Sequence, residues 1–386
     1  MSVKVSTLHE RTKPPMSPGS SLNTQEYFIN MGPQHPSTHG VLRLMLKLDG
    51  ETVREVIPVL GYIHRSIEKI GESLTYQQFI HQVDRMDYLS ALSNNWAVSM
   101  AVEKAAGIQI SERVQYIRTL MAELQRIQSH QLWWGVFGMD LGAFTPFLYG
   151  FRDREMITDI FEETMGARLN MNYIQPGGIM FDIHPNFVKR TKEVLKYFKP
   201  KLREYEELLS DNVIVQERIR NVGILTAEKA ISLGATGPVL RGSGVPYDLR
   251  KIHPYGVYDK VDFDVAIGSV GDCWDRYYVR VEEMRQSMRI IEQLIDNIPE
   301  GKFEEVKPAK KLIIPEGKYY TQLETARGIL GCFIVSDGKE TPYRVHMRSP
   351  NFNNLWSITE IVPGWRVADM VANLSTLDLV IPDIDR

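Results

Sequence analysis

Two histidines lie four residues apart in the segment MGPQHPSTHGVLRL, and imidazoles at this spacing can hold a metal ion or exchange protons. His35 and His39 would share one face of a helix, but Pro36 and Gly40 favour an extended or turning loop. A metal pair is therefore disfavoured. The residues leave two interpretations open: a loop imidazole that gives or takes a proton near neutral pH, and a histidine that only caps a turn.

A second candidate is the segment HQVDRMDYLS, residues 81–90, which crowds five titratable side chains together. Such crowding shifts pKa values through like and unlike charges. If the segment is helical, Asp84 and Arg85 can reach Tyr88 and orient its phenol toward a ligand. The alternative is an ordinary solvated face of ion pairs.

Asp140 is the one charged residue in residues 133–151, an apolar stretch rich in aromatic side chains. A buried lone carboxylate must be paired, protonated or close to water. An apolar cleft with one ionisable group suits a lipid-like or quinoid ligand, whereas a kinked core helix capped by Asp140 is the plain structural alternative. The stretch is interrupted by glycines and a proline and falls short of the ~20 apolar residues of a membrane span.

Composition excludes several classes of function. The 45 Lys and Arg against 48 Asp and Glu give a net charge of -3, and no polybasic run suits nucleic acid or an anionic membrane surface. Cys273 and Cys332 form no CxxC pair, so this chain cannot build a disulfide framework, a zinc ribbon or an iron–sulfur cluster. The glycine-rich segment 234–244 matches no nucleotide-binding motif and predicts turns. The first residues lack the apolar region of a signal peptide.

The elements that must position these residues follow from periodicity. Leucines at 42, 44, 46 and 48 alternate with polar residues, which predicts a half-buried strand, and Asp49-Gly50 predicts a hairpin turn into a returning strand. Helical spacing dominates from about residue 70 to 305, with Pro200 expected to kink or break a charged, peripheral helix. Strands return after residue 317, and WRVADMVANL predicts a short amphipathic helix.

Seven separated motifs occur in one order along the chain. They are MGPQHPSTHGVLRL, HRSIEK, RMDYL, MDLGAFTPF, GILTAEKAISLGATGPVLRGSGVPYDLRK, GDCWDRY with RVEEMRQS, and the closing IPDIDR. Together they resemble the D-type subunit, also called the 49 kDa subunit, of the proton-pumping NADH:quinone oxidoreductase, respiratory complex I. The likeness runs from about residue 25 to the C-terminus.

The resemblance implies a mainly helical α+β fold similar to the large subunit of nickel–iron hydrogenases, with a central helical bundle between β-rich terminal regions. The expected organisation is a flexible arm over 1–24, a β-hairpin region with the site loop over 25–62, a helical bundle over 63–305 and a β/α region over 306–386. Hydrogenases hold their metal with two CxxC pairs, which this chain lacks. In the family, the vacated cavity takes a quinone headgroup.

By the same resemblance, His39 and Tyr88 are the expected hydrogen-bond partners of the quinone carbonyl, and Asp140 is the acidic residue behind His39. His39 and Asp140 would form a proton relay toward the membrane arm. Arg65 and Arg85 would lie beside a [4Fe–4S] cluster in the neighbouring small subunit. Many relatives carry a histidine where this chain has Asn170, so a redox titration of that cluster should show a weaker pH dependence.

The resemblance therefore implies quinone as substrate, with no metal or flavin bound by this chain itself and no activity for the isolated chain. Expected partners are the small iron–sulfur subunit, the 30 kDa C-type subunit and the membrane subunit of the quinone site. The expected location is peripheral, on the cytoplasmic side of a bacterial inner membrane or the matrix side in an organelle. A complex fed by a ferredoxin-type donor and a non-catalytic docking scaffold remain alternatives, whereas the cysteine count excludes a hydrogenase.

Overall fold

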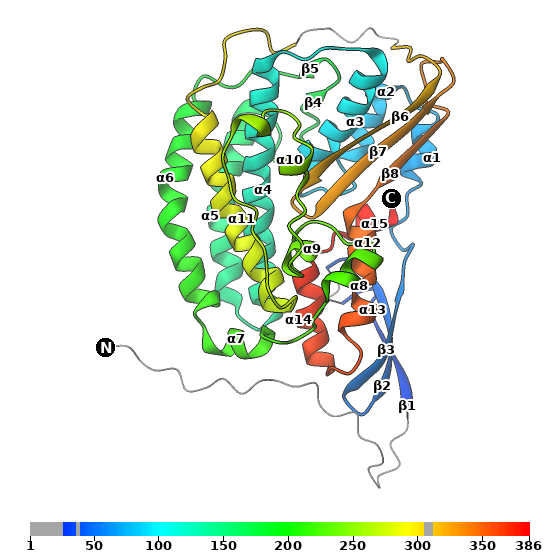
Figure 1. Ribbon diagram of the computed structural model, residues 1–386, viewed down its shortest axis with the longest axis vertical. Helices are drawn as coiled ribbons and strands as arrows, with labels where there is room; N and C mark the ends of the chain where they lie inside the picture. The colour runs from blue at the N-terminus through cyan, green and yellow to red at the C-terminus, as the bar shows by residue number, and fades with distance from the viewer. Residues whose placement is uncertain (1–25, 36–38, 305–311) are drawn as a thin grey trace.

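The computed structural model describes residues 26–35, 39–304 and 312–386, and it has an α+β fold that is mainly helical. Long helices form a bundle on one side, and two antiparallel three-stranded sheets lie at separate positions along the other side (Figure 1). The predicted arm over 1–24 lies outside the described residues.

The N-terminal sheet has the strand order β1-β2-β3, formed by Glu26–Met31, Arg43–Asp49 and Thr52–Val59. The predicted strand and its return are β2 and β3, joined by the turn at Asp49-Gly50. The leucines at 42, 44, 46 and 48 are all buried, because side chains alternate between the two faces of a strand. This sheet holds the loop that contains His39.

The bundle begins after this sheet, and it contains several long helices. α3 spans Ala91–Ala106, α4 spans Glu112–Asp140, α5 spans Phe144–Met165 and α11 spans Cys273–Leu294. The shorter elements are α1 (Ile67–Gly71), α2 (Tyr76–Val83), β4 (Ile174–Gln175), β5 (Gly178–Ile179), α7 (Val213–Ile219), α8 (Ala227–Ser232), α9 (Pro238–Gly242), α10 (Leu249–Ile252) and η3 (Tyr258–Lys260). The helical spacing predicted between about residues 70 and 305 is confirmed by α4 and α11.

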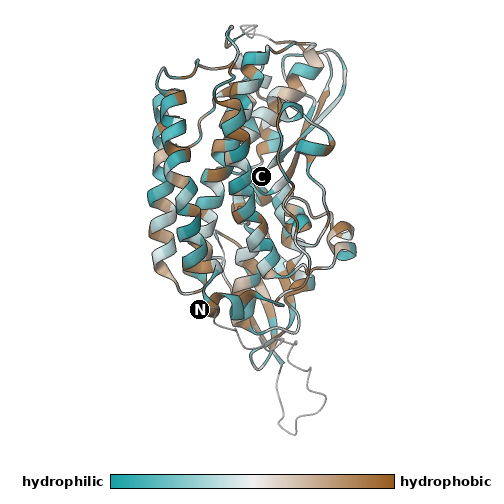
Figure 2. Cartoon of the chain, turned by 60° about the vertical axis from the view of Figure 1, so that its left-hand side comes forward, coloured by the Kyte–Doolittle hydropathy of each residue, from teal (hydrophilic) through white to brown (hydrophobic). Residues whose placement is uncertain are grey.

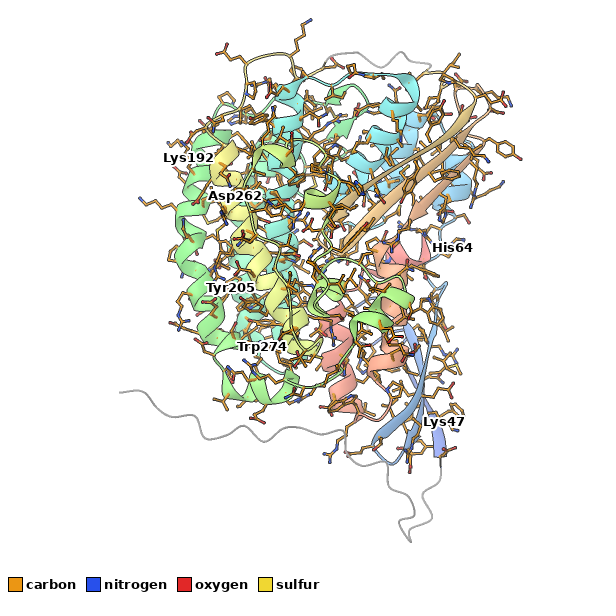
Figure 3. The ribbon with its side chains drawn as sticks, viewed as in Figure 1. Lys47, His64, Lys192, Tyr205, Asp262 and Trp274 are labelled. Carbon is orange, nitrogen blue, oxygen red and sulfur yellow. The ribbon has the colours of Figure 1, made fainter. Side chains whose placement is uncertain are left out.

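The charged helix α6, Phe187–Tyr205, corrects one prediction, because it continues through Pro200 without a break. The π-helical turn η2, Glu206–Ser210, follows directly. α6 does lie at the outer side of the bundle, where Lys192 forms an ion pair with Asp296 of the segment after α11 (Figure 3).

The C-terminal sheet has the order β6-β7-β8, formed by Gly317–Thr325, Gly328–Ser336 and Arg344–Arg348. Four helices follow: α12 (Pro350–Trp356), α13 (Ile358–Ile361), α14 (Val367–Leu377) and α15 (Ile381–Asp385). α14 confirms the predicted amphipathic helix, and α15 carries the IPDID part of the last motif.

Two hydrophobic cores hold these elements. The larger core contains residues of helices α2 through α6, of α11 and of the inner face of the C-terminal sheet. The smaller core packs the N-terminal sheet against α8, α9 and helices α12 through α15. The segment 234–244, predicted as turns, contains the short helix α9, so that prediction is wrong in part. Arg241 of α9 is fully buried among carboxylates.

Polar and apolar residues alternate along the long helices (Figure 2). In the three described ranges, no helix combines the length and the hydropathy that crossing a membrane requires.

Candidate functional site

His39 and Asp140 form the first contact of the site. Nε2 of His39 lies 2.7 Å from Oδ2 of Asp140, and the two side chains are 12% and 4% exposed. Asp140 is the last residue of α4, whose first turn is capped by Ser111. His39 has a φ of 53° and Gly40 a φ of 133°, so the chain turns sharply at the point where the imidazole is presented. The ionised carboxylate accepts a hydrogen bond from the Nε2–H group, so the other ring nitrogen, Nδ1, faces away from Asp140.

Tyr88 stands in a turn segment that follows α2, and this corrects the predicted helix. α2 ends at Val83, so Asp84 and Arg85 do not reach Tyr88 along a helical face. Tyr88 is half-buried, and among the described residues none forms a hydrogen bond with its hydroxyl. Burial raises the pKa of the Tyr88 phenol above its usual value, although the charge of Arg327 acts in the opposite direction. The phenol therefore keeps its proton at neutral pH and can donate it.

Arg327 holds the Tyr88 segment in place. Its guanidinium lies 3.1 Å from Asp87 and 3.0 Å from Asp378, and it also donates to Ser129 at 3.0 Å. Arg327 is fully buried, and the carboxylates of Asp87 and Asp378 are nearly so. One buried cation thus joins the segment beside Tyr88 to the residue that follows α14.

The C-terminal segment reaches the His39 loop as well. A Cβ atom at Gly40 would lie 3.2 Å from the side chain of Ile381, so the loop packs directly against α15. Asp383 of the same helix accepts hydrogen bonds from Ser349 and Asn351, and burial raises its pKa to about 6. The His39 loop therefore packs against Ile381, and Arg327 links the Tyr88 segment to Asp378 of the same stretch, residues 378–383.

Arg65, Arg85 and Asn170 belong to a second, adjacent group. Arg65 donates to the carbonyl oxygen of Arg85 at 2.5 Å, and both side chains are exposed. Partial burial and the charge of Arg85 lower the pKa of Arg65. Asn170 has a φ of 54°, and its amide oxygen is buried without a hydrogen-bond partner among the described residues.

Asp84 joins the Asn170 segment to the Arg85 turn. Its Oδ2 accepts the backbone N–H of Asn172 at 2.8 Å, and its Oδ1 accepts from the Asn95 amide. The side chain is almost completely buried, and burial raises its pKa to about 7. Asp84 is one of the five titratable groups that the sequence placed in residues 81–90, but its contact with the Asn170 segment was not predicted.

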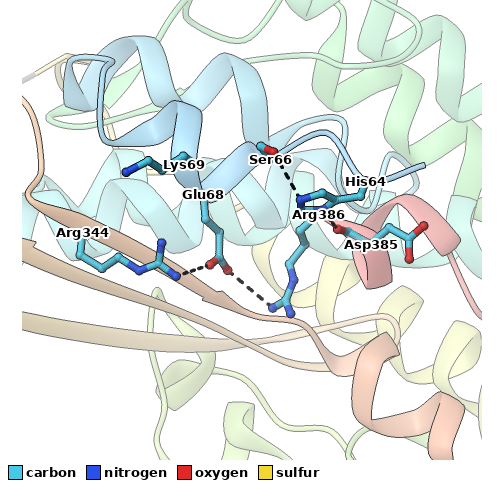
Figure 4. Close-up of a pocket in the computed structure, with 7 residues that line it drawn as sticks. All are labelled: His64, Ser66, Glu68, Lys69, Arg344, Asp385 and Arg386. Atoms are coloured by element: carbon cyan, nitrogen blue, oxygen red, sulfur yellow. Dashed lines mark hydrogen bonds and ion pairs between the residues drawn. The ribbon is translucent and has the colours of Figure 1, made fainter. Parts of the chain in front are cut away.

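The HRSIEK motif and the closing motif meet around a polar cavity of about 240 Å³ (Figure 4). His64 lies 2.5 Å from the carbonyl oxygen of Asp385, whose carboxylate accepts the backbone N–H groups of Gly61 and Ile63 at 2.9 Å each. Glu68 faces two cations of the cavity wall, Arg344 and Arg386, and it also lies 3.1 Å from Nδ1 of His346. The two motifs thus position Arg65 next to the C-terminal segment.

Metal chemistry has little support from the side chains. In the described part of the chain, no group of three or more His, Cys, Asp or Glu side chains could hold a metal ion. Both cysteines are buried, and burial raises the thiol pKa of Cys273 and brings that of Cys332 to about 12. The site is instead built from hydrogen-bond donors and acceptors: an imidazole, a phenol and buried carboxylates.

The residues that sequence reasoning missed are Arg327 and Asp378. Asp378 had a usable signal, since it is a single charge in the apolar run LSTLDLVI and meets the argument applied to Asp140. Arg327 stands between strands β6 and β7 with no such pattern around it. Its role depends on contacts with residues 240 and 51 positions away, which no local spacing reveals.

Comparison with known proteins gives a family. The model of the respiratory-chain NADH dehydrogenase 49 kDa subunit matches residues 140–314 and 303–386. The C/D subunit of the NADH-quinone oxidoreductase of Bacteroides thetaiotaomicron is 52% identical over 363 residues, which cover 94% of this chain and 68% of that protein. The D subunits of the enzymes of Desulforamulus reducens and Bacillus anthracis are 48% and 45% identical, covering 95% and 94% of this chain and all of each relative.

An α+β chain with a site of proton donors and buried carboxylates is thus related along nearly its whole length to subunits of NADH-quinone oxidoreductases. The chain belongs to the family of the 49 kDa subunit of respiratory-chain NADH dehydrogenase, complex I.

Proposed function

We propose that this chain is the D-type subunit of an NADH:quinone oxidoreductase and binds the quinone headgroup between His39 and Tyr88. The observation that carries the proposal is the convergence of the His39 loop and the Tyr88 segment on residues 378–383, within a family of NADH dehydrogenase subunits. The relatives are named NADH-quinone oxidoreductase subunits, which identifies quinone as the substrate of those complexes.

The chemistry of these side chains suits a quinone. Reduction of a quinone to a quinol takes up two electrons and two protons, and negative charge develops on the carbonyl oxygens as electrons arrive. Tyr88 keeps its phenolic proton because burial raises its pKa, so it can donate to one oxygen. When both of its ring nitrogens carry protons, His39 donates one N–H to Asp140, at 2.7 Å, and can donate the other to the same headgroup.

Electrons must enter from partner subunits, because this chain offers no ligand set of its own within the described residues. We place Arg65, Arg85 and Asn170 toward a [4Fe–4S] cluster held by the small iron–sulfur subunit. Arg65 and Arg85 are both exposed, and the Arg65 guanidinium donates to the backbone carbonyl of Arg85, so two cationic side chains lie close together on a surface that suits an anionic group. Cations near a cluster raise its reduction potential.

The proposed assembly includes the 30 kDa C-type subunit and the membrane subunit of the quinone site. The C/D relatives support the first of these, because the C-type and D-type subunits form one polypeptide there. The chain would lie at the membrane through its partners, on the cytoplasmic side in a bacterium, and would be inactive alone.

The first test is quinone reductase turnover of the assembled complex with Tyr88→Phe. Phenylalanine keeps the ring and removes the proton donor, so turnover should fall by about 10²-fold while the cluster's electron paramagnetic resonance signal persists. His39→Ala should act in the same direction. Tyr343→Phe is the control, since that side chain is 69% exposed. Full turnover in Tyr88→Phe would refute the headgroup position, and loss of the cluster signal in the same variant would indicate an assembly defect.

We further propose that His39 and Asp140 pass protons from the site toward the membrane arm. Asp140→Asn keeps the size of the side chain but removes its charge, so the imidazolium loses its counter-ion and quinone reduction should slow at least about tenfold. Turnover and proton translocation are measured together in proteoliposomes. Wild-type values for both would contradict the relay.

Two alternatives make different predictions. A docking scaffold requires assembly but not the Tyr88 hydroxyl, so Tyr88→Phe would leave turnover intact. A complex with a ferredoxin-type donor would lose turnover in Tyr88→Phe with that donor, while NADH would support none even in the wild type.

A further inference from the structure

Four polar atoms are buried without hydrogen-bond partners around Trp133, in the part of the chain that the structure describes. They are Nδ1 of His130, Nε of Arg280, Oγ of Ser375 and Oδ2 of Asp378. The four residues come from α4, α11 and the end of α14, and none is more than 4% exposed. A buried polar atom without a partner costs about 1 to 3 kcal/mol, so four of them close together require an explanation.

The other polar atoms of these residues are engaged, which fixes where the four atoms lie. Nε2 of His130 lies 2.8 Å from Glu283, and Arg280 donates to the carbonyl oxygens of Arg276 and Leu377 at 2.7 and 3.1 Å. Oδ1 of Asp378 accepts from Arg327 at 3.0 Å. Rotation of these side chains would break existing bonds, so the unpartnered atoms cannot readily find each other.

Trp133 contacts Arg280 and Ser375, and electrostatic interactions with Arg280 and Asp378 place His130 near both. The guanidinium of Arg280 lies 4.8 Å from the centre of the Trp133 ring, and the indole N–H donates to the carbonyl oxygen of Ser375 at 2.8 Å. Nε of Arg280 lies 3.7 Å from Oδ2 of Asp378, beyond hydrogen-bond reach. At this separation the two groups still attract each other as an ion pair, but each atom keeps a hydrogen-bonding direction that a water molecule beside the pair can use.

The chemistry of the four atoms selects the ligand. The Glu283 carboxylate accepts the Nε2 proton of His130, so Nδ1 is an acceptor, as is Oδ2 of Asp378, whereas Nε of Arg280 is a donor. A water molecule can donate to the two acceptors and accept from Arg280. A metal cation is disfavoured by the Arg280 charge and an anion by the Asp378 carboxylate.

We propose that the space between His130, Arg280 and Asp378 is an internal water site. The bound water donates a hydrogen bond to Oδ2 of Asp378, the carboxylate oxygen that Arg327 does not bind. Because Arg327 also binds Asp87, the water supports the segment that presents Tyr88. The water site stands on these contacts alone and does not depend on quinone binding.

The test is hydroxyl-radical footprinting of the assembled complex by X-ray radiolysis, read by mass spectrometry. Radicals formed from bound water oxidise the side chains that surround it, even when those side chains are buried. Trp133, Trp134 and Trp96 are all at most 1% exposed, but Trp134 stacks on Tyr205 and Trp96 packs against Tyr255. Trp133 should be oxidised severalfold faster than the other two tryptophans.

Two variants keep the proposal falsifiable. Ser375→Ala removes one polar atom of the site and should lower oxidation of Trp133, and Ser375→Val should lower it further by filling the space. If Ser375→Val fails to assemble, Ser375→Ala alone decides. Oxidation of Trp133 no faster than that of Trp134, or oxidation unchanged in Ser375→Ala, would overturn the water site.

Discussion

Asp140 illustrates how a single residue can carry functional information. A carboxylate that is 4% exposed is expensive to keep charged, and the structure gives it one close partner, His39, 101 residues away in sequence. The sequence predicted that Asp140 must be paired, protonated or hydrated, and its pairing is confirmed. That the partner is His39 followed only from the family resemblance, since no spacing rule connects residues so far apart.

At the same scale, Asp84 should make stability depend on pH. Its pKa is raised from 3.8 to about 7 in the folded state, because burial disfavours the charged form. Below about pH 4 the carboxyl group is protonated in both the folded and the unfolded state, so it adds no pH dependence to the free energy of unfolding. Between about pH 4 and pH 7 the unfolded state ionises while the folded state stays protonated, so the free energy of unfolding should fall by up to about 4 kcal/mol and level off above pH 7.

Asp84→Asn should remove that decline, because an amide does not titrate, and the buried Oδ1 of Asn95 is available as its acceptor. The measurement is urea unfolding of the purified chain between pH 4 and pH 8. Asp262→Asn, at a 74% exposed side chain, serves as the control. Equal pH slopes for the wild type and Asp84→Asn would rule out a raised pKa at Asp84.

At the scale of elements, periodicity predicted the helices and strands whose sequences carry a clear local pattern. Strands β2 and β3, their turn, and helices α4, α11 and α14 follow from alternation and helical spacing. The end of α2 was missed, because Asp84 leaves the helix to bind Asn95 and Asn172 from other elements. Pro200 failed as a helix breaker for a related reason: α6 packs against α5 and α11, and tertiary contacts outweigh the lost backbone hydrogen bond.

The close packing of α4 against α5 depends on glycine residues, and this predicts how substitutions there change stability. A Cβ at Gly150 would lie 2.6 Å from the carbonyl oxygen of Gln131, whereas one at Gly135 would lie 3.1 Å from the backbone of Phe147. Gly150→Ala should therefore destabilise the chain by about 1 to 3 kcal/mol, and Gly135→Ala by less. Urea unfolding of the two variants at one pH measures the difference. The reverse order would mean that this helix pair is not packed as described.

At the scale of the whole molecule, the candidate site is assembled from three distant parts of the chain. The His39 loop, the Tyr88 segment and residues 378–383 meet through Ile381 and through the Arg327 ion pairs. The sequence motifs identified each part, but their meeting depends on tertiary packing, which local patterns do not encode. Arg327 shows this most clearly, because a single buried cation links β6 and β7 to both ends of the site.

The most direct test of the central claim is photolabelling of the assembled complex with a quinone that carries a photoreactive headgroup. Labelled peptides are identified by mass spectrometry, with unlabelled quinone as the competitor. We predict competed labels in residues 39–45 and 84–90 of the same chain. Labels confined to other surfaces, such as the outer face of α6, would contradict a quinone headgroup between His39 and Tyr88.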